Sequence, residues 1–335
     1  MPNVQRVFIT DCEGPISKND NAFELSSQII PNGDKIFSVI SKYDDVEADV
    51  VKRPDYNAGD TLKLILPTFR AFGATDELME EYSSNNVLLV PGAKETLGEV
   101  EPLKPHIVST SYEHYIRALC GIVDFPFENT YSTRLRINNY GISESERARL
   151  QEIAKEVVEM PVMTIPSSNS LDDFSAEDRR NIERLDKIFW EEIPQMGIGR
   201  ILKEVKPVGG HEKANAVKEI SEKLGVKLSE VMYVGDSITD QKAFRLVRDA
   251  GGLTVSFNGN DYAVREAEVG ITAPHTDMIS IIAETFRDEG REGVIETAKE
   301  FPRVEVIVPE NMEEFSKHSS RFRKTVRGEP IGKLG

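Results

Sequence analysis

The chain has 335 residues, of which 39% are hydrophobic and 29% charged, and its formal net charge at pH 7 is −16. This length predicts two or three domains, and the composition is typical of a soluble globular protein, neither disordered nor membrane-embedded. The negative charge would repel a phosphate backbone, so we expect no nucleic-acid partner. Two cysteines cannot build a disulfide framework, and no apolar run reaches the roughly 18 residues of a membrane span. We therefore expect a cytoplasmic protein with no membrane contact.

The first predicted element is a strand over residues 7–10 that leads into Asp11 and Glu13. β-Branched and aromatic residues favour the strand, and Gly14-Pro15 turns the chain. Ligands bind at the carboxyl ends of strands in an open α/β sheet, so Asp11 is expected to face a crevice. A carboxylate there can act as a nucleophile. An ordinary acidic turn explains this stretch equally well.

Residues 16–90 are predicted to be mainly helical, with apolar side chains at helical spacing within 36–43 and 62–72. A crossover between neighbouring strands needs only about a dozen residues, so about 75 are too many for one connection. We expect 16–90 to be a small helical domain over the strand end, a candidate lid. The sheet is predicted to resume near 87–90.

A strand from residue 106 is predicted to run into the hydroxyl cluster Ser109-Thr110-Ser111, with a helix after it. Hydroxyl groups and the free N–H groups at a helix start can bind an anion. Serine and threonine are also common helix caps, and capping is the better explanation of this cluster alone. A polar hairpin or edge strand is expected at 130–142.

Residues 143–195 are predicted to form a second insertion, an antiparallel pair of helices. Ser175 and Asp178 have the spacing of a capping box at the start of its second helix. Its charged residues are interpreted as a solvated face. Roles in substrate access or dimerisation stay open.

Lys213 stands at the start of a predicted helix, where a cation opposes the helix dipole. This position is reasonable if Lys213 faces a bound anion. The preceding His211-Glu212 resembles a zinc-binding helix, but Asn215 stands where the second histidine is needed, so we expect no zinc.

A buried strand predicted over 231–235 runs into Asp236 and Asp240, two carboxylates four residues apart. Mg²⁺ prefers hard oxygen ligands and takes one or two carboxylates together with waters and phosphate oxygens. A turn with a capping Asp240 explains the same residues without a metal. Short strands are also expected near 253–257, 269–272 and 304–308.

The last residues differ in charge from the rest of the chain. From Lys317 onward the tail has six Lys or Arg against one Glu. We interpret 311–335 as a solvated basic extension that docks on acidic surface. Reaching over the site, or binding a partner, is the less favoured alternative.

Four stretches occur in a characteristic order: Asp-x-acid-Gly at Asp11, a strand ending at Ser109, Lys213 at a helix start, and Gly-Asp-x-x-x-Asp at Asp236. This order resembles the haloacid dehalogenase (HAD) superfamily, especially its phosphatases. The resemblance covers the core segments, about half of the chain. The lid at 16–90 looks like the type 1 cap of phosphoserine-phosphatase-like members.

The resemblance implies an α/β fold with a doubly wound, mainly parallel sheet in three layers. The core would comprise 1–15, 91–142 and 196–310, and the helical cap 16–90. The insertion at 143–195 has no counterpart that we can name, and 311–335 would be a C-terminal extension.

The resemblance also implies catalytic roles. Asp11 would be the nucleophile that forms an aspartyl-phosphate. Glu13 would be the general acid and then the general base, with its backbone carbonyl a ligand of Mg²⁺. The family usually has Asp in place of Glu13, and we expect the lid or backbone to adjust to the longer side chain.

Further residues would bind the phosphate and the metal ion. Ser109, Thr110 and Lys213 would hold the phosphoryl oxygens. Asp236 would bind Mg²⁺ together with Asp11, and Asp240 would be another ligand or the partner of one. Without Mg²⁺ and Lys213, these carboxylates would repel each other and the substrate.

The predicted function is Mg²⁺-dependent hydrolysis of a small phosphorylated metabolite. The same scaffold also supports cleavage of C–halogen and C–P bonds, but the acid at Glu13 favours phosphate esters. The alternative is a non-catalytic binding or scaffold subunit of a larger complex. A homo-oligomer, or a protein partner bound through 143–195 or the basic tail, stays open.

Overall fold

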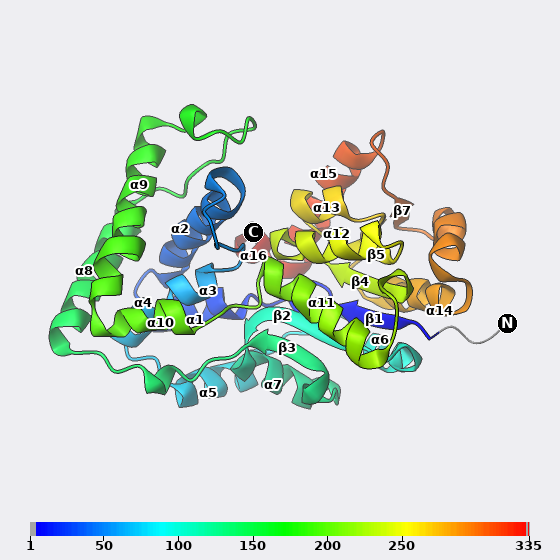
Figure 1. Cartoon of the computed structure of the whole chain (residues 1–335), viewed down its shortest axis with the longest axis horizontal. Helices are drawn as coiled ribbons and strands as arrows, with labels where there is room; N and C mark the ends of the chain where they lie inside the picture. Colours follow the sequence, from blue (N-terminus) through cyan, green and yellow to red (C-terminus); the bar gives the residue numbers. More distant parts are fainter. Residues whose placement is uncertain (1–4, 333, 335) are drawn as a thin grey trace.

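The computed structural model describes residues 5–332 and residue 334. Its centre is a seven-stranded sheet with the order β3-β2-β1-β4-β5-β6-β7 (Figure 1). Neighbouring strands are parallel except β6 and β7, which are antiparallel. The predicted α/β fold with a mainly parallel sheet is thus confirmed. The strands are β1 (Val7–Thr10), β2 (His106–Tyr112), β3 (Thr130–Thr133), β4 (Val231–Gly235), β5 (Leu253–Phe257), β6 (Val269–Ile271) and β7 (Val304–Val306).

Helices cover both faces of the sheet, which gives the three predicted layers. Val7 and Ile9 of β1 pack on one side with α11, α12 and α13, whereas Phe8 packs on the other side with α14. Because β1 is covered on both faces, its four residues are all buried, and all except Thr10 are apolar. This composition is typical of a central parallel strand. The helices around the sheet are α6 (Ala93–Glu99), α7 (Glu113–Val123), α11 (Gly210–Leu224), α12 (Gln241–Asp249), α13 (Asp261–Glu266) and α14 (Asp277–Thr297).

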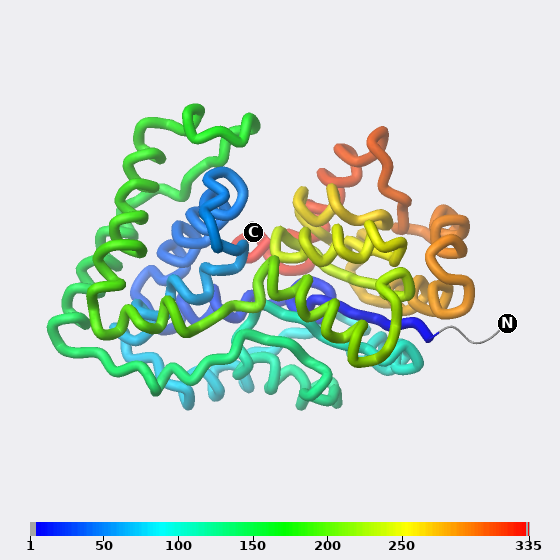
Figure 2. The backbone as a smooth tube through the Cα atoms, viewed as in Figure 1, coloured from blue at the N-terminus to red at the C-terminus, as the bar shows by residue number. Residues whose placement is uncertain are grey.

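The remaining helices before residue 205 form what we call the helical body, which lies to the left of the sheet in Figure 1. Its two parts, predicted as a lid and an insertion, share one hydrophobic core. Tyr43 stacks on Phe189 with ring centroids 5.8 Å apart, and Figure 2 shows the two parts of the chain side by side. The domain boundaries stay predictions. The helical body comprises α1 (Asn21–Ile29), α2 (Gly33–Asp45), α3 (Thr61–Leu64), α4 (Leu66–Ala71), α5 (Asp76–Asn86), α8 (Glu144–Glu159), α9 (Ala176–Asp186) and α10 (Ile201–Glu204).

Two local predictions were wrong. Residues 87–90 form no strand, only a single bridge between Leu89 and Ser17. Strand β2 continues through the hydroxyl cluster to Tyr112, so Ser109–Ser111 do not cap the next helix. Their hydroxyls did not stop the strand because pairing with β3 extends as far as Tyr112. Of the stretch 130–142, expected to be a hairpin or an edge strand, only 130–133 form an edge strand, β3, and the edge strand expected at 304–308 is present as β7.

The C-terminal residues form two helices, α15 (Met312–Arg327) and α16 (Glu329–Gly332). The prediction of a solvated extension was wrong, because α15 buries Phe315, Ser319 and Arg323 against the rest of the protein. Among the described residues, no helix is both long enough and apolar enough to cross a membrane.

Candidate active site

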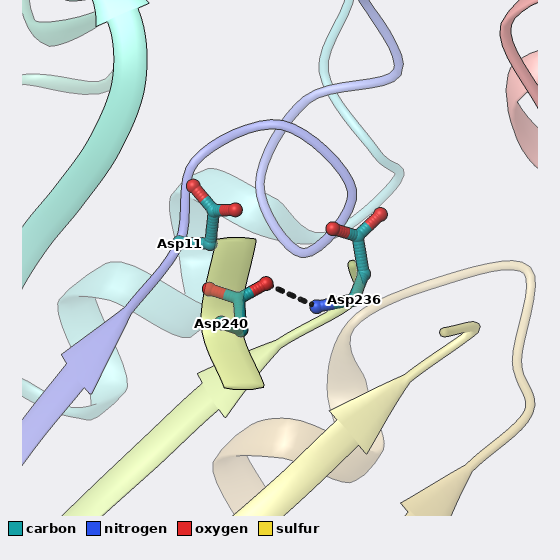
Figure 3. Close-up of side chains that lie close together, drawn as sticks. All are labelled: Asp11, Asp236 and Asp240. Carbon is teal, nitrogen blue, oxygen red and sulfur yellow. Dashed lines mark hydrogen bonds between the residues drawn. The ribbon is translucent and has the colours of Figure 1, made fainter. Parts of the chain in front are cut away.

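Three aspartates meet at the carboxyl ends of the two central strands. Asp11 follows β1, Asp236 follows β4, and Asp240 lies one turn further along (Figure 3). One carboxylate oxygen from each lies within 4.8 Å of the others, and all three side chains are buried. The strand order reverses between β1 and β4, and this reversal is where open α/β sheets bind their ligands. Gly14 allows the turn after β1 to lie close to Asp236, since a Cβ at position 14 would come within 2.1 Å of Asp236 Oδ2.

Lys213 provides a positive charge inside this cluster. Its Nζ lies 2.5 Å from Asp11 Oδ2 and 2.9 Å from Asp240 Oδ1, and its side chain is completely buried. Burial alone would lower the pKa of Lys213, but the two aspartates raise it above its ordinary value. The ammonium therefore stays charged and offsets part of the cost of burying the carboxylates.

Asp240 is held by the protein on both carboxylate oxygens. Its Oδ2 accepts hydrogen bonds from the backbone N–H groups of Asp236 and Ser237, each at 3.0 Å. Its Oδ1 accepts from the Tyr233 hydroxyl at 2.7 Å as well as from Lys213. A carboxylate has about four acceptor positions, so little capacity is left for a metal ion. This geometry favours Asp240 as a partner that positions Lys213 and the Asp236 loop.

The carboxyl group of Asp11 has a raised pKa. Burial raises its pKa to about 7, with Lys213 acting in the opposite direction and Asp240 and Asp236 reinforcing the rise. A divalent cation beside Asp11 would offset the repulsion between its carboxylate and those of Asp236 and Asp240. The donor set of hard carboxylate oxygens fits Mg²⁺, with Asp11 and Asp236 as the residues best placed to hold it.

Glu13 lies two residues after Asp11, and it lines one cavity together with Asp11 and Asp236. Its Oε1 accepts a hydrogen bond from the backbone N–H of Asn21 at 2.8 Å, at the start of the helical body. Burial raises the pKa of Glu13 well above its ordinary value, and Asp20 adds to the effect while Arg327 opposes it. The raised pKa favours the protonated form of Glu13, which is the form that can donate a proton.

The two hydroxyl residues are placed differently. Thr110 lines the cavity, and its hydroxyl donates to the Val208 carbonyl at 3.0 Å. Ser109 is buried, and its hydroxyl accepts from the Ser111 N–H at 3.2 Å. No hydrogen bond within residues 5–332 joins Ser109 to the three aspartates or to Lys213.

The interpretation of the sequence missed Arg323 and Arg327 of α15. Both donate from Nη1 to Asp236 Oδ2, Arg327 at 3.0 Å, and Arg323 also donates to the Asp236 carbonyl at 3.1 Å. Their side chains are only 4% and 5% exposed. The tail thus reaches over the site, contrary to the favoured prediction. The four-residue spacing of Phe315, Ser319, Arg323 and Arg327 on one helix face is the signal that could have revealed this.

A small cavity of about 100 Å³ opens between these groups and the helical body. Helix α2 faces it with Asp44 and Asp45, and the loop before α1 adds Asp20. The wall also contains apolar and hydroxyl side chains, namely Phe37, Ser41, Thr61 and Leu62. The cavity therefore joins the end of the sheet to the candidate lid.

No protein-family model and no curated protein matches the chain. Among solved structures, gene product AF1437 from Archaeoglobus fulgidus is 29% identical, with a TM-score of 0.85 over 99% of each chain. A phospho-aspartyl intermediate analogue of phosphoserine phosphatase is 13% identical, with a TM-score of 0.49 over 82% of this chain and 97% of the other. A substrate-bound phosphoserine phosphatase is 14% identical, with a TM-score of 0.48 over 82% and 96%. The first comparison shows that the whole fold, helical body included, occurs in another protein. The likeness to the phosphatases is too distant to show a function.

Proposed function

We propose that the chain is a HAD-type phosphomonoester hydrolase that requires Mg²⁺ and uses Asp11 as its nucleophile. The observation that carries the proposal is the contact of 2.5 Å between Asp11 and the buried Lys213, in a cluster that Asp236 completes. Phosphoryl transfer depends mainly on positioning and on neutralising charge around the phosphorus. A carboxylate, an ammonium and a metal-binding carboxylate in one buried cluster supply these requirements.

In the first step, an oxygen of Asp11 attacks phosphorus and the bond from phosphorus to the ester oxygen breaks. The leaving alcohol takes its proton from Glu13, whose raised pKa favours the protonated form. In the second step, Glu13 accepts a proton from water as that water attacks phosphorus. The bond between phosphorus and the Asp11 oxygen breaks, which regenerates Asp11, and inorganic phosphate leaves. Lys213 keeps Asp11 oriented and balances its charge.

Mg²⁺, held by Asp11 and Asp236, would neutralise negative charge on the phosphoryl oxygens. The substrate is proposed to be a small phosphorylated metabolite, consistent with a cavity of about 100 Å³. Its wall includes both the catalytic residues and α2 of the candidate lid.

Hydrolysis of p-nitrophenyl phosphate by the purified chain with Mg²⁺ tests this proposal. We expect turnover that EDTA removes, and a loss on the order of 10³-fold or more in Asp11→Asn and Asp236→Asn. Asp249→Asn, an exposed aspartate of α12, is the matched control and should retain wild-type activity. Activity that survives Asp11→Asn would exclude an aspartyl-phosphate. No hydrolysis of a panel of phosphate esters would favour the non-catalytic binding subunit.

A further inference from the structure

Helix α15 is fixed to the sheet by its first turns. Phe315 is buried against Gly270 of β6, where a Cβ would come within 2.1 Å of the phenyl ring. One turn later, the Ser319 hydroxyl donates to the Gly259 carbonyl at 2.7 Å. Figure 1 shows α15 beside α13, with α16 near the centre of the molecule. These contacts direct the last two turns of α15, with Arg323 and Arg327, into the cavity.

Arg327 of α15 connects two separate parts of the site. Its Nε donates to the Lys18 carbonyl at 3.1 Å, and Nη2 donates to the Asn19 carbonyl. Its Nη1 donates to Asp236 Oδ2. The guanidinium therefore spans the distance between the loop that leads into the helical body and the end of β4.

Arg323 carries unused hydrogen-bonding capacity inside the protein. Its Nη1 contacts Asp236, and its Nε is buried without a hydrogen-bond partner. A buried donor with no acceptor costs free energy unless a ligand supplies one. Because Arg323 and Arg327 both line the cavity, an anion bound there could supply acceptors.

The charges around the cluster point to the same conclusion. Asp11, Asp236 and Asp240 carry three negative charges when ionised, which Lys213 and one Mg²⁺ would balance. A phosphate monoester then brings two more negative charges. Arg323 and Arg327 both pair with Asp236 in the structure, and a phosphate bound beside Asp236 would add further negative charge for their two guanidinium groups to offset. Guanidinium groups also match phosphate oxygens with paired N–H donors.

We propose that Arg323 and Arg327 of α15 bind the phosphate group of the substrate. This proposal rests on the proposed function. A phosphate placed for attack by Asp11 must lie beside Asp236, and both guanidinium groups end there. The C-terminal helix is thus a substrate-binding part of the active site, and the two arginines determine specificity for a dianionic group.

The test is isothermal titration of inorganic phosphate into the full-length protein with saturating Mg²⁺. We expect Arg323→Ala and Arg327→Ala each to weaken phosphate binding by about ten- to a hundredfold, because charge-assisted hydrogen bonds are lost. Arg327→Lys should restore part of the affinity. Arg321→Ala removes an exposed arginine of the same helix and should bind phosphate like the wild type.

Thermal unfolding identifies any variant that does not fold, and Mg²⁺ titration without phosphate separates metal binding from phosphate binding. Folded Arg323→Ala and Arg327→Ala proteins with wild-type phosphate affinity would overturn the proposal, as would a wild type that does not bind phosphate. Phosphate binding needs no turnover, so the two proposals fail separately. An inactive wild type whose phosphate affinity depends on Arg327 would contradict only the proposed function. An active enzyme whose phosphate affinity is unchanged by the substitutions would contradict only this proposal.

Discussion

Glu13 illustrates how far a single residue could be interpreted from the sequence. Its place after β1 follows from the strand and the glycine turn, so the acid itself could be predicted. The shift in its pKa could not, because burial and Asp20 raise the pKa while Arg327, more than 300 positions away in the chain, opposes them. The local sequence therefore predicts which side chains follow a strand, whereas their pKa values depend on residues from distant elements.

Glu13→Gln tests the general-acid role through the leaving group. The amide cannot donate a proton as an acid does, so we expect alkyl phosphates to react about 10²- to 10⁴-fold more slowly. p-Nitrophenolate leaves without protonation, so the rate of hydrolysis of p-nitrophenyl phosphate should fall much less. Steady-state kcat for both substrates measures the difference. Equal losses on the two esters would contradict the assignment.

At the scale of elements, strands β1 and β4 and helix α11 could be predicted because apolar runs and glycine turns mark their ends. The sequence predicted a solvated tail in place of helix α15, because the net positive charge of the tail is typical of exposed segments. Charge alone does not indicate that one face of the helix is buried. Burial of Arg323 depends on Asp236, which is 87 positions away. No pattern within the tail identifies that partner.

Phe315→Ala tests the docking of α15. Removing a buried phenyl ring costs about 3–5 kcal/mol of stability, and here the loss falls on the contact that holds the helix to β6. We expect a lower free energy of unfolding in urea and weaker phosphate binding, because both arginines lose their anchor. Phe322→Ala, on a partly exposed position of the same helix, should retain phosphate affinity. Unchanged phosphate affinity in Phe315→Ala would show that the anchor lies elsewhere.

At the scale of the whole molecule, the helical body closes the cavity from the side opposite the sheet. The sequence predicted helices at 16–90 and 143–195, but not that they share one core. The hydroxyl of Tyr43, for example, accepts from Trp190 Nε1 at 2.7 Å, and these residues are 147 positions apart. Amphipathic spacing shows that a helix has a buried face, but not which helix covers it.

The helical body also buries Asp44, and this predicts a pH-dependent stability. Burial raises the pKa of Asp44 from 3.8 to about 7, with Asp60 and Asp45 adding to the rise. The folded state therefore holds a proton that the unfolded state releases at lower pH. The resulting stabilisation is complete below about pH 4 and is lost as pH rises through about 7, by up to about 1.4 kcal/mol per pH unit.

Asp44→Asn should remove this part of the pH dependence. We expect urea unfolding in EDTA, at about pH 5 and about pH 8, to show a smaller fall in stability for the variant than for the wild type. Asp34→Asn, an exposed aspartate of the same helix, should follow the wild type. Parallel pH curves for the wild type and Asp44→Asn would contradict the ionisation inferred for Asp44.

The central claim is that Asp11 takes the phosphoryl group, and mass spectrometry of the protein quenched in acid during turnover of p-nitrophenyl phosphate tests it most directly. We expect the wild type to gain one phosphoryl group in the peptide that contains Asp11, and Asp11→Asn to gain none. A phosphoryl group on another residue, or active turnover with no phosphorylated protein under conditions that preserve acyl phosphates, would contradict the account.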